Sequence, residues 1–254
     1  MQRRSVYLIV LWVIGIAAVV IAALQPPISQ PIAYHHFADR RTLLGIPNFW
    51  NVVSNMPFLL VGVLGLIEVV RGRYPGGLSS LRIAYGAFFV FIGCVCFGSG
   101  YYHWAPSNAT LAWDRLPMAI AFMIFLSIVI SEHINERVGL WAIVPLVAIG
   151  IFSVWYWDYT ETLGRGDLRP YGLVQFLSLI LLLLIFWLFP SRLTGIGYLW
   201  VMFGGYALAK VLEELDAHIY AVGGAMSGHA LKHVVAAVGM YFLLLALRQR
   251  RPRE

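Results

Sequence analysis

The stretch Ile83–His103, IAYGAFFVFIGCVCFGSGYYH, decides the fold class of this chain. Its 21 residues include no Asp, Glu, Lys or Arg, and a helix needs about 20 apolar residues to cross a bilayer. Seven further predominantly apolar runs flank it: Ser5–Leu24, Phe49–Ile67, Leu116–Ser131, Val138–Trp157, Tyr171–Phe189, Gly195–Leu212 and Ser227–Leu247. These runs predict an all-α membrane protein.

The composition excludes a water-soluble globule. Of 254 residues, 60% are hydrophobic and only 12% are charged, about half the charge of a soluble domain. The net charge of +6 could indicate a nucleic-acid partner, but four arginines fall in the last seven residues and others flank apolar runs. Membrane topology explains them better, so no nucleic-acid partner is expected, and no obligate protein partner is evident.

We expect one integral membrane domain over residues 1–254. A seven-helix bundle core would span residues 49–247, and the run at 5–24 would add one extra N-terminal transmembrane helix. Arg3 and Arg4 before that run also resemble the start of a signal peptide, but about nineteen apolar residues is long for such a segment. The cleavage pattern around Ala22–Leu24 is poor, which favours a retained helix.

Basic residues predict the orientation, because short cytoplasmic loops are enriched in Lys and Arg. With the N-terminus inside, eleven arginines collect on the cytoplasmic side and five on the other, while Lys210 and Lys232 lie within spans. Both termini are therefore predicted to be cytoplasmic. The compact loops are in keeping with a bacterial plasma membrane.

Five polar residues are predicted to meet near the outer ends of three spans. Ser99 and His103 are four apart, as are His229 and His233, so each pair shares a helix face. Asp114 lies at the outer entrance of the fourth span. The orientation from arginine counts places all five at one depth on one side.

Three neutral imidazoles with one open position are typical of a catalytic zinc site. Asp114 could take a proton from the zinc-bound water, and Ser99 could donate to an oxyanion, which together suit metal-assisted acyl hydrolysis. Simpler interpretations stay open. A lone membrane histidine is often a hydrogen bonder between helices, Ser99 could bond a backbone carbonyl, and Asp114 before Arg115 suits a helix N-cap.

At these residues the sequence resembles the alkaline ceramidases and their wider superfamily, which includes the adiponectin-type receptors and the Per1-like proteins. The matching stretches are Phe49-Trp50-Asn51-Val52-Val53-Ser54-Asn55, Gly98-Ser99-Gly100-Tyr101-Tyr102-His103, Asp114-Arg115-Leu116-Pro117-Met118 and His229-Ala230-Leu231-Lys232-His233.

The resemblance implies a zinc ion bound by His103, His229 and His233, a water deprotonated by Asp114, and an oxyanion assisted by Ser99. It also implies a ceramide-like lipid amide as substrate, cleaved to a sphingoid base and a fatty acid. Calcium regulation is not carried over, because few carboxylates precede Phe49. Open alternatives are an esterase on glycerolipid or lipid-anchor acyl chains, and a receptor or transport protein with structural zinc.

Other polar residues have structural interpretations. Asn51 and Asn55 are expected to hydrogen-bond between helices rather than contact substrate. Lys210 and Lys232 are expected to snorkel or to pair with the acidic group at residues 213–216, although such pairing could also gate a cavity. His35 and His36 could bind a second metal, but adjacent loop histidines are usually solvated.

Overall fold

The described part of the chain covers residues 2–191 and 193–253 of a computed structural model, and it is helical with no sheet. Seven helices in it are long and apolar enough to span a membrane: Arg3–Leu24, Phe49–Val70, Ser79–Trp104, Asn108–Ile134, Glu136–Thr162, Arg169–Leu188 and Gly228–Gln249. These helices indicate an integral, multi-pass membrane protein. The prediction of an all-α membrane protein is therefore confirmed.

The helix expected at residues 195–212 is present as α9 (Gly197–Glu214) but is not among these seven. Its 18 residues include three charged side chains, Lys210, Glu213 and Glu214. By composition alone, this is too many charges for a membrane-spanning helix. The prediction of a seven-helix core plus an extra N-terminal helix, eight spans in all, therefore stays a prediction at α9.

The chain divides into two compact units. The first unit comprises Met1–Gln30 and Ala119–Arg192, and the second comprises Pro31–Met118 and Leu193–Glu254. Helix α5 (Asn108–Val129) contributes its first half to the second unit and its second half to the first. This division into compact units does not test the expectation of one membrane domain, which stays a prediction.

The first unit holds the N-terminal helix and the central part of the chain. None of the most apolar window of α1 is buried, and Trp12 is 71% exposed. Such a surface suits contact with lipid rather than with water. Besides α1 (Gln2–Leu24) and the end of α5, the unit contains α6 (Glu136–Thr162), α7 (Arg169–Gly172), α8 (Ser178–Leu188) and two π-helical segments, Ile130–Ile134 and Leu173–Leu177.

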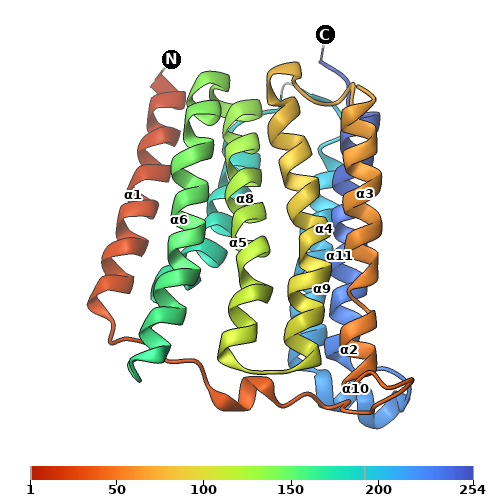
Figure 1. Ribbon diagram of the computed structural model, residues 1–254. Helices are drawn as coiled ribbons and strands as arrows, with labels where there is room; N and C mark the ends of the chain where they lie inside the picture. Colours follow the sequence, from red (N-terminus) through yellow and green to blue (C-terminus); the bar gives the residue numbers. More distant parts are fainter. Residues whose placement is uncertain (1, 192, 254) are drawn as a thin grey trace. The chain divides into compact units, whose positions relative to one another are not determined.

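The second unit pairs long helices through glycines. Helix α3 packs along α4, and α9 packs along α11 (Figure 1). A Cβ on Gly62 would lie 2.6 Å from the backbone nitrogen of Gly93, and one on Gly205 would lie 3.3 Å from Cα of Gly239. Small residues thus allow close backbone approach, as is common between helices in membranes. The unit's elements are a 3-10 turn (Ile32–His35), α2 (Phe49–Val53), α3 (Met56–Val70), a second 3-10 turn (Ser79–Leu81), α4 (Arg82–Trp104), the start of α5, α9, α10 (Asp216–Gly223) and α11 (Gly228–Gln249).

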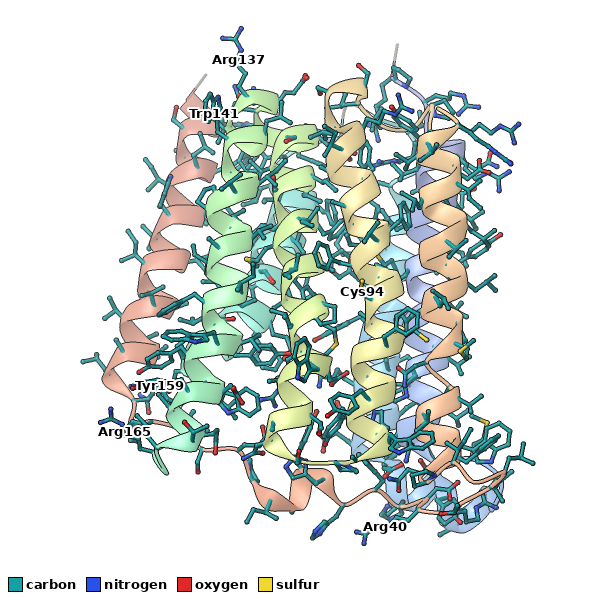
Figure 2. All side chains as sticks on the ribbon, in the orientation of Figure 1. Arg40, Cys94, Arg137, Trp141, Tyr159 and Arg165 are labelled. Atoms are coloured by element: carbon teal, nitrogen blue, oxygen red, sulfur yellow. The ribbon has the colours of Figure 1, made fainter. Side chains whose placement is uncertain are left out.

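One end of the second unit holds the elements that surround the histidines. Figure 1 shows α10 and the loop before α2 at this end, where α4 ends and α11 begins. Arg40 projects from the loop at this end, whereas Cys94 lies further along α4 within the helix bundle (Figure 2). Cys94 and Cys96 are both free thiols. The histidines of interest belong to this same end.

Candidate metal centre

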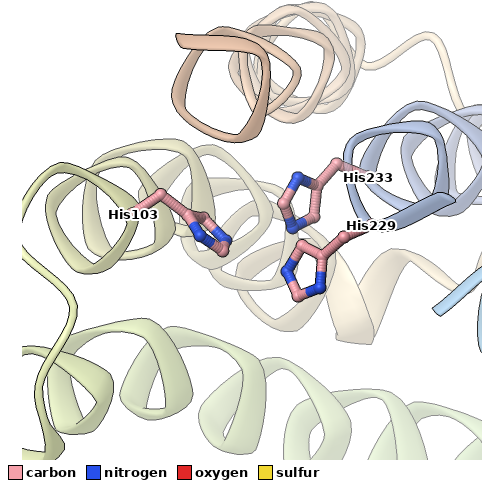
Figure 3. A group of neighbouring side chains, drawn as sticks. All are labelled: His103, His229 and His233. Carbon is pink, nitrogen blue, oxygen red and sulfur yellow. The ribbon is translucent and has the colours of Figure 1, made fainter. Parts of the chain in front are cut away.

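Three histidines from two helices converge in the second unit. His103 is the penultimate residue of α4, and His229 and His233 lie in the first two turns of α11. One ring nitrogen of each can be chosen so that all three lie within 4.8 Å of one another (Figure 3). Nitrogens sharing one tetrahedral zinc ion lie on the order of 3.3 Å apart, so small side-chain adjustments suffice to bind it. The group could therefore hold a metal ion.

Local sequence explains how the three rings meet. His229 and His233 are one helical turn apart, so both face His103 across the gap between α11 and α4. The ring centroids of His229 and His233 each lie 4.9 Å from that of His103. Gly228 lets α11 begin at this point, because a Cβ there would lie 2.1 Å from the carbonyl oxygen of Leu212.

All three imidazoles are buried, and two of them have a ring nitrogen that a metal ion could use. His103 is 1% exposed, and His229 and His233 are each 6% exposed. Among the described residues, Nδ1 of His103 and Nε2 of His229 are buried and have no hydrogen-bond partner. An unpaired buried polar atom costs about 1–3 kcal/mol, and an imidazole that donates a lone pair to a metal regains much of that. These residues fit a divalent ion that prefers nitrogen ligands.

Ser99 and Asp114 come together beside this group. Ser99 is 2% exposed and lies one turn before His103 on α4, and its side chain interacts with the Asp114 carboxylate. The close approach of α4 and α5 depends on Gly98, where a Cβ would lie 2.2 Å from the carbonyl oxygen of Trp113. All five residues predicted to form a site thus lie in one unit, near the end of α4 and the starts of α5 and α11.

The alternative interpretation of Asp114 as a helix N-cap is wrong. Helix α5 begins at Asn108, so Asp114 lies in its second turn. Ser107 caps this helix instead, because its Oγ accepts a hydrogen bond from the backbone N–H of Thr110 at 3.2 Å. The helix extends further towards this end than the position of Asp114 suggested, which leaves the Asp114 carboxylate free of a capping role.

Ser54 is a neighbour of the site that the sequence analysis did not single out. Its Oγ lies 2.9 Å from Nδ1 of His233. This contact leaves Nε2 of His233 as the nitrogen available to a metal. The motif around Phe49 contains Ser54, but only the fold shows that it reaches α11.

The loop before α2 covers the histidines. Phe37 is 4% exposed, and its ring centroid lies 4.7 Å from that of His103 and 4.9 Å from that of His229. The Asp216 carboxylate accepts hydrogen bonds from the backbone N–H groups of Ala38 and His229. A hydrophobic side chain and a bridging carboxylate therefore close one side of the histidine group, and neither was predicted.

His35 does not form a second metal site with His36. Its Nδ1 lies 3.0 Å from the Tyr102 hydroxyl and its Nε2 lies 2.9 Å from Oδ1 of Asn108. Both ring nitrogens are thus used in hydrogen bonds that fasten the loop to the ends of α4 and α5. The expectation that these loop histidines are simply solvated is also wrong for His35.

Charged side chains near the site are paired. Nζ of Lys210 lies 2.6 Å from Oε2 of Glu213, and Lys232 forms an ion pair with the other oxygen of Glu213. The expected pairing of both lysines with the acidic group is confirmed. Lys232 lies between His229 and His233 on α11, so this pairing neutralises a positive charge that a divalent ion would otherwise face.

Asn51 and Asn55 do not bond between membrane-spanning helices as expected. The Asn51 side chain donates to the carbonyl of Asp39 in the loop at 3.1 Å, and the Asn55 side chain donates to the carbonyl of Asn51 at 2.7 Å. Both asparagines are fully buried. They fasten the break between α2 and α3 to the loop that covers the site.

Comparison with known proteins decides the family. A family model described as ceramidase matches residues 44–189, which is more than half of the chain. The chain belongs to the ceramidase family. The matched region of this ceramidase-family chain contains Ser99, His103 and Asp114, whereas His229 and His233 lie beyond it. No curated protein matches the chain. Family membership confirms the resemblance to the alkaline ceramidases and implies a hydrolase with a lipid substrate.

Proposed function

We propose that the protein is a zinc-dependent lipid amidase that hydrolyses the N-acyl bond of ceramide-like sphingolipids to a sphingoid base and a fatty acid. The buried group of His103, His229 and His233 carries this proposal, because three imidazoles leave a fourth position open to water or substrate. Membership of the ceramidase family supports the substrate class.

Zinc held by the three histidines would supply Lewis-acid polarisation of the acyl carbonyl and a water of lowered pKa. Asp114 accepts the proton of the attacking water and passes it to the nitrogen of the leaving sphingoid base. Ser99 donates a hydrogen bond from its hydroxyl to the oxygen that becomes negative as the carbonyl is attacked. The interaction between the Ser99 and Asp114 side chains keeps both groups within reach of one reacting centre.

We further propose that α9 completes a seven-helix core and that α1 is an additional span. Pairing of Glu213 with Lys210 and Lys232 lowers the cost of placing these charges in or near the bilayer, which makes α9 an acceptable span despite its composition. The arginine distribution then puts both termini in the cytoplasm and the site towards the outer leaflet. A lipid acyl linkage lies near the headgroup boundary, at the depth expected for the histidines.

The test is turnover of a labelled ceramide by purified protein in detergent. His229→Ala should abolish turnover, and Asp114→Ala should lower kcat about 100-fold or more, since general-base catalysis contributes at least that much. His218→Ala is the matched control, because His218 is an exposed histidine on α10 outside the group. Retained turnover in His229→Ala would reject the proposal.

Product analysis separates the amidase from its rivals. Mass spectrometry of an amidase reaction shows a free amine beside the fatty acid, whereas an esterase acting on glycerolipid or a lipid anchor releases an alcohol or thiol. A receptor or transport protein with structural zinc would turn over neither class of substrate. Only release of the amine from ceramide agrees with the proposal.

A further inference from the structure

The break between α2 and α3 brings a serine hydroxyl to the histidine group. Helix α2 ends at Val53 and α3 starts at Met56, so Ser54 and Asn55 lie between them. Ser54 is 5% exposed, and its Oγ contacts both Nδ1 of His233 at 2.9 Å and the carbonyl oxygen of Asn51 at 3.4 Å. The hydroxyl therefore faces a ring nitrogen on one side and a backbone carbonyl on the other.

The single hydroxyl proton decides the direction of both contacts. A carbonyl oxygen can only accept a hydrogen bond, so the Ser54 hydroxyl donates its hydrogen bond to the carbonyl oxygen of Asn51. The Ser54 oxygen then accepts a hydrogen bond from His233, which requires the ring proton on Nδ1. In that tautomer Nε2 of His233 carries a free lone pair. The opposite arrangement would leave Nε2 protonated and unable to bind a metal.

We propose that Ser54 is a positioning residue that holds His233 in the tautomer and ring orientation in which Nε2 faces the metal. This inference rests on the proposed zinc site. Outer partners of this kind fix ligating histidines in metalloproteins, and their loss typically lowers metal affinity 10- to 100-fold. Among the described residues, the unpartnered Nδ1 of His103 and Nε2 of His229 contrast with the bonded Nδ1 of His233.

Asn51 extends this arrangement to the covering loop. Its carbonyl accepts from Ser54 and from the side chain of Asn55, while its own amide donates to the carbonyl of Asp39. Asn51 is fully buried, so these bonds are shielded from water. The orientation of Ser54 is thus set by a bonded chain that starts in the loop over the site.

The test measures zinc affinity without substrate, by elemental analysis of protein equilibrated with chelators of graded strength. Ser54→Ala should bind zinc roughly 10- to 100-fold more weakly than the wild type, and Ser54→Thr, which keeps the hydroxyl, should restore most of the affinity. Ser178→Ala is the matched control, because Ser178 is also buried but its hydroxyl bonds the backbone carbonyls of Val174 and Gln175 in the preceding turn, in the first unit. It should leave zinc affinity unchanged.

Wild-type zinc affinity in Ser54→Ala, or equal weakening in Ser54→Ala and Ser54→Thr, would overturn the inference. If Ser54→Ala does not fold, Ser54→Val is compared with Ser54→Thr, because the two side chains share a shape but only Thr has the hydroxyl, and the same loss of affinity is expected from Val. A chain whose zinc affinity depends on Ser54 but which leaves ceramide intact would contradict only the proposed function. Ceramide turnover with zinc affinity indifferent to Ser54 would contradict only this inference.

Discussion

The carboxylate of Asp216 accepts a hydrogen bond from the backbone N–H of His229 at 2.7 Å. Its other oxygen accepts from the backbone N–H of Ala38 at 2.9 Å. One side chain thus joins the first turn of the histidine helix to the loop that covers the site. A negative charge at this position also complements the positive end of the α11 dipole.

Replacing Asp216 by Asn should destabilise this end of the second unit. An amide offers one accepting oxygen, so one of the two backbone donors would face an NH₂ group and lose its bond. The expected loss is about 1–3 kcal/mol, measured as a lowered Tm in detergent. Asp158→Asn is the control, because Asp158 is also half-buried but belongs to the first unit. If Asp216→Asn, Asp158→Asn and the wild type all had the same Tm, the bridging role of Asp216 would be contradicted.

Gly98→Ala should damage the pairing of Ser99 with Asp114. The new Cβ would lie 2.2 Å from the carbonyl oxygen of Trp113, so the start of α5 and the end of α4 would have to move apart. Overpacking of this kind costs about 1–3 kcal/mol, and turnover of ceramide should fall with it.

Gly100→Ala provides the control for Gly98→Ala on the same helix. A Cβ at Gly100 would meet no atom within 4 Å. Thermal melting and ceramide turnover of the Gly100 variant should match the wild type. If the Gly98 variant behaves like the Gly100 variant, close contact between α4 and α5 is not needed to position Ser99 and Asp114.

The loop over the site should weaken in acid through Asp39. Burial opposes ionisation of this carboxyl, but hydrogen bonds from Arg41 and its charge outweigh burial and hold the pKa of Asp39 below its usual value. The ionised form therefore contributes stability above the unfolded pKa of about 3.9, and this contribution is lost as the pH falls through the lower folded pKa.

Melting curves between about pH 6 and pH 3 test this link, since they bracket the unfolded pKa. Arg41→Met should lower the Tm at pH 6, and its gap from the wild type should shrink as the pH falls through the folded pKa of Asp39. Arg165→Met, which removes an exposed arginine of the first unit, should track the wild type throughout. A gap between Arg41→Met and the wild type that does not change with pH would contradict the role of Asp39.

Hydrophobic runs were enough to predict most of the fold. They place most of the long helices to within about five residues, because a bilayer imposes a minimum apolar length, but α5 begins at Asn108 and not at the predicted Leu116. The helix at α9 shows where this signal weakens. Glu213 pairs with Lys210 one turn away on the same helix and with Lys232 of α11 through the fold, but composition alone scores these residues as separate charges.

The candidate site was partly predictable for a similar reason. Spacing of four residues within one helix predicts that His229 and His233 share a face, and this needs no tertiary information. Ser54, Phe37 and Asp216 were missed because each reaches the histidines from another element, through a helix break, a loop and a short helix. The N-cap alternative for Asp114 failed because Ser107 offers an earlier cap.

X-ray absorption spectroscopy of the purified, metal-loaded protein tests the central claim most directly. We predict one zinc per chain, bound by three imidazole nitrogens at about 2.0–2.1 Å with a light atom from water in the fourth position, and loss of this signal in His103→Ala, His229→Ala and His233→Ala. A site saturated by four side chains, or zinc binding that survives the loss of these histidines, would contradict the account.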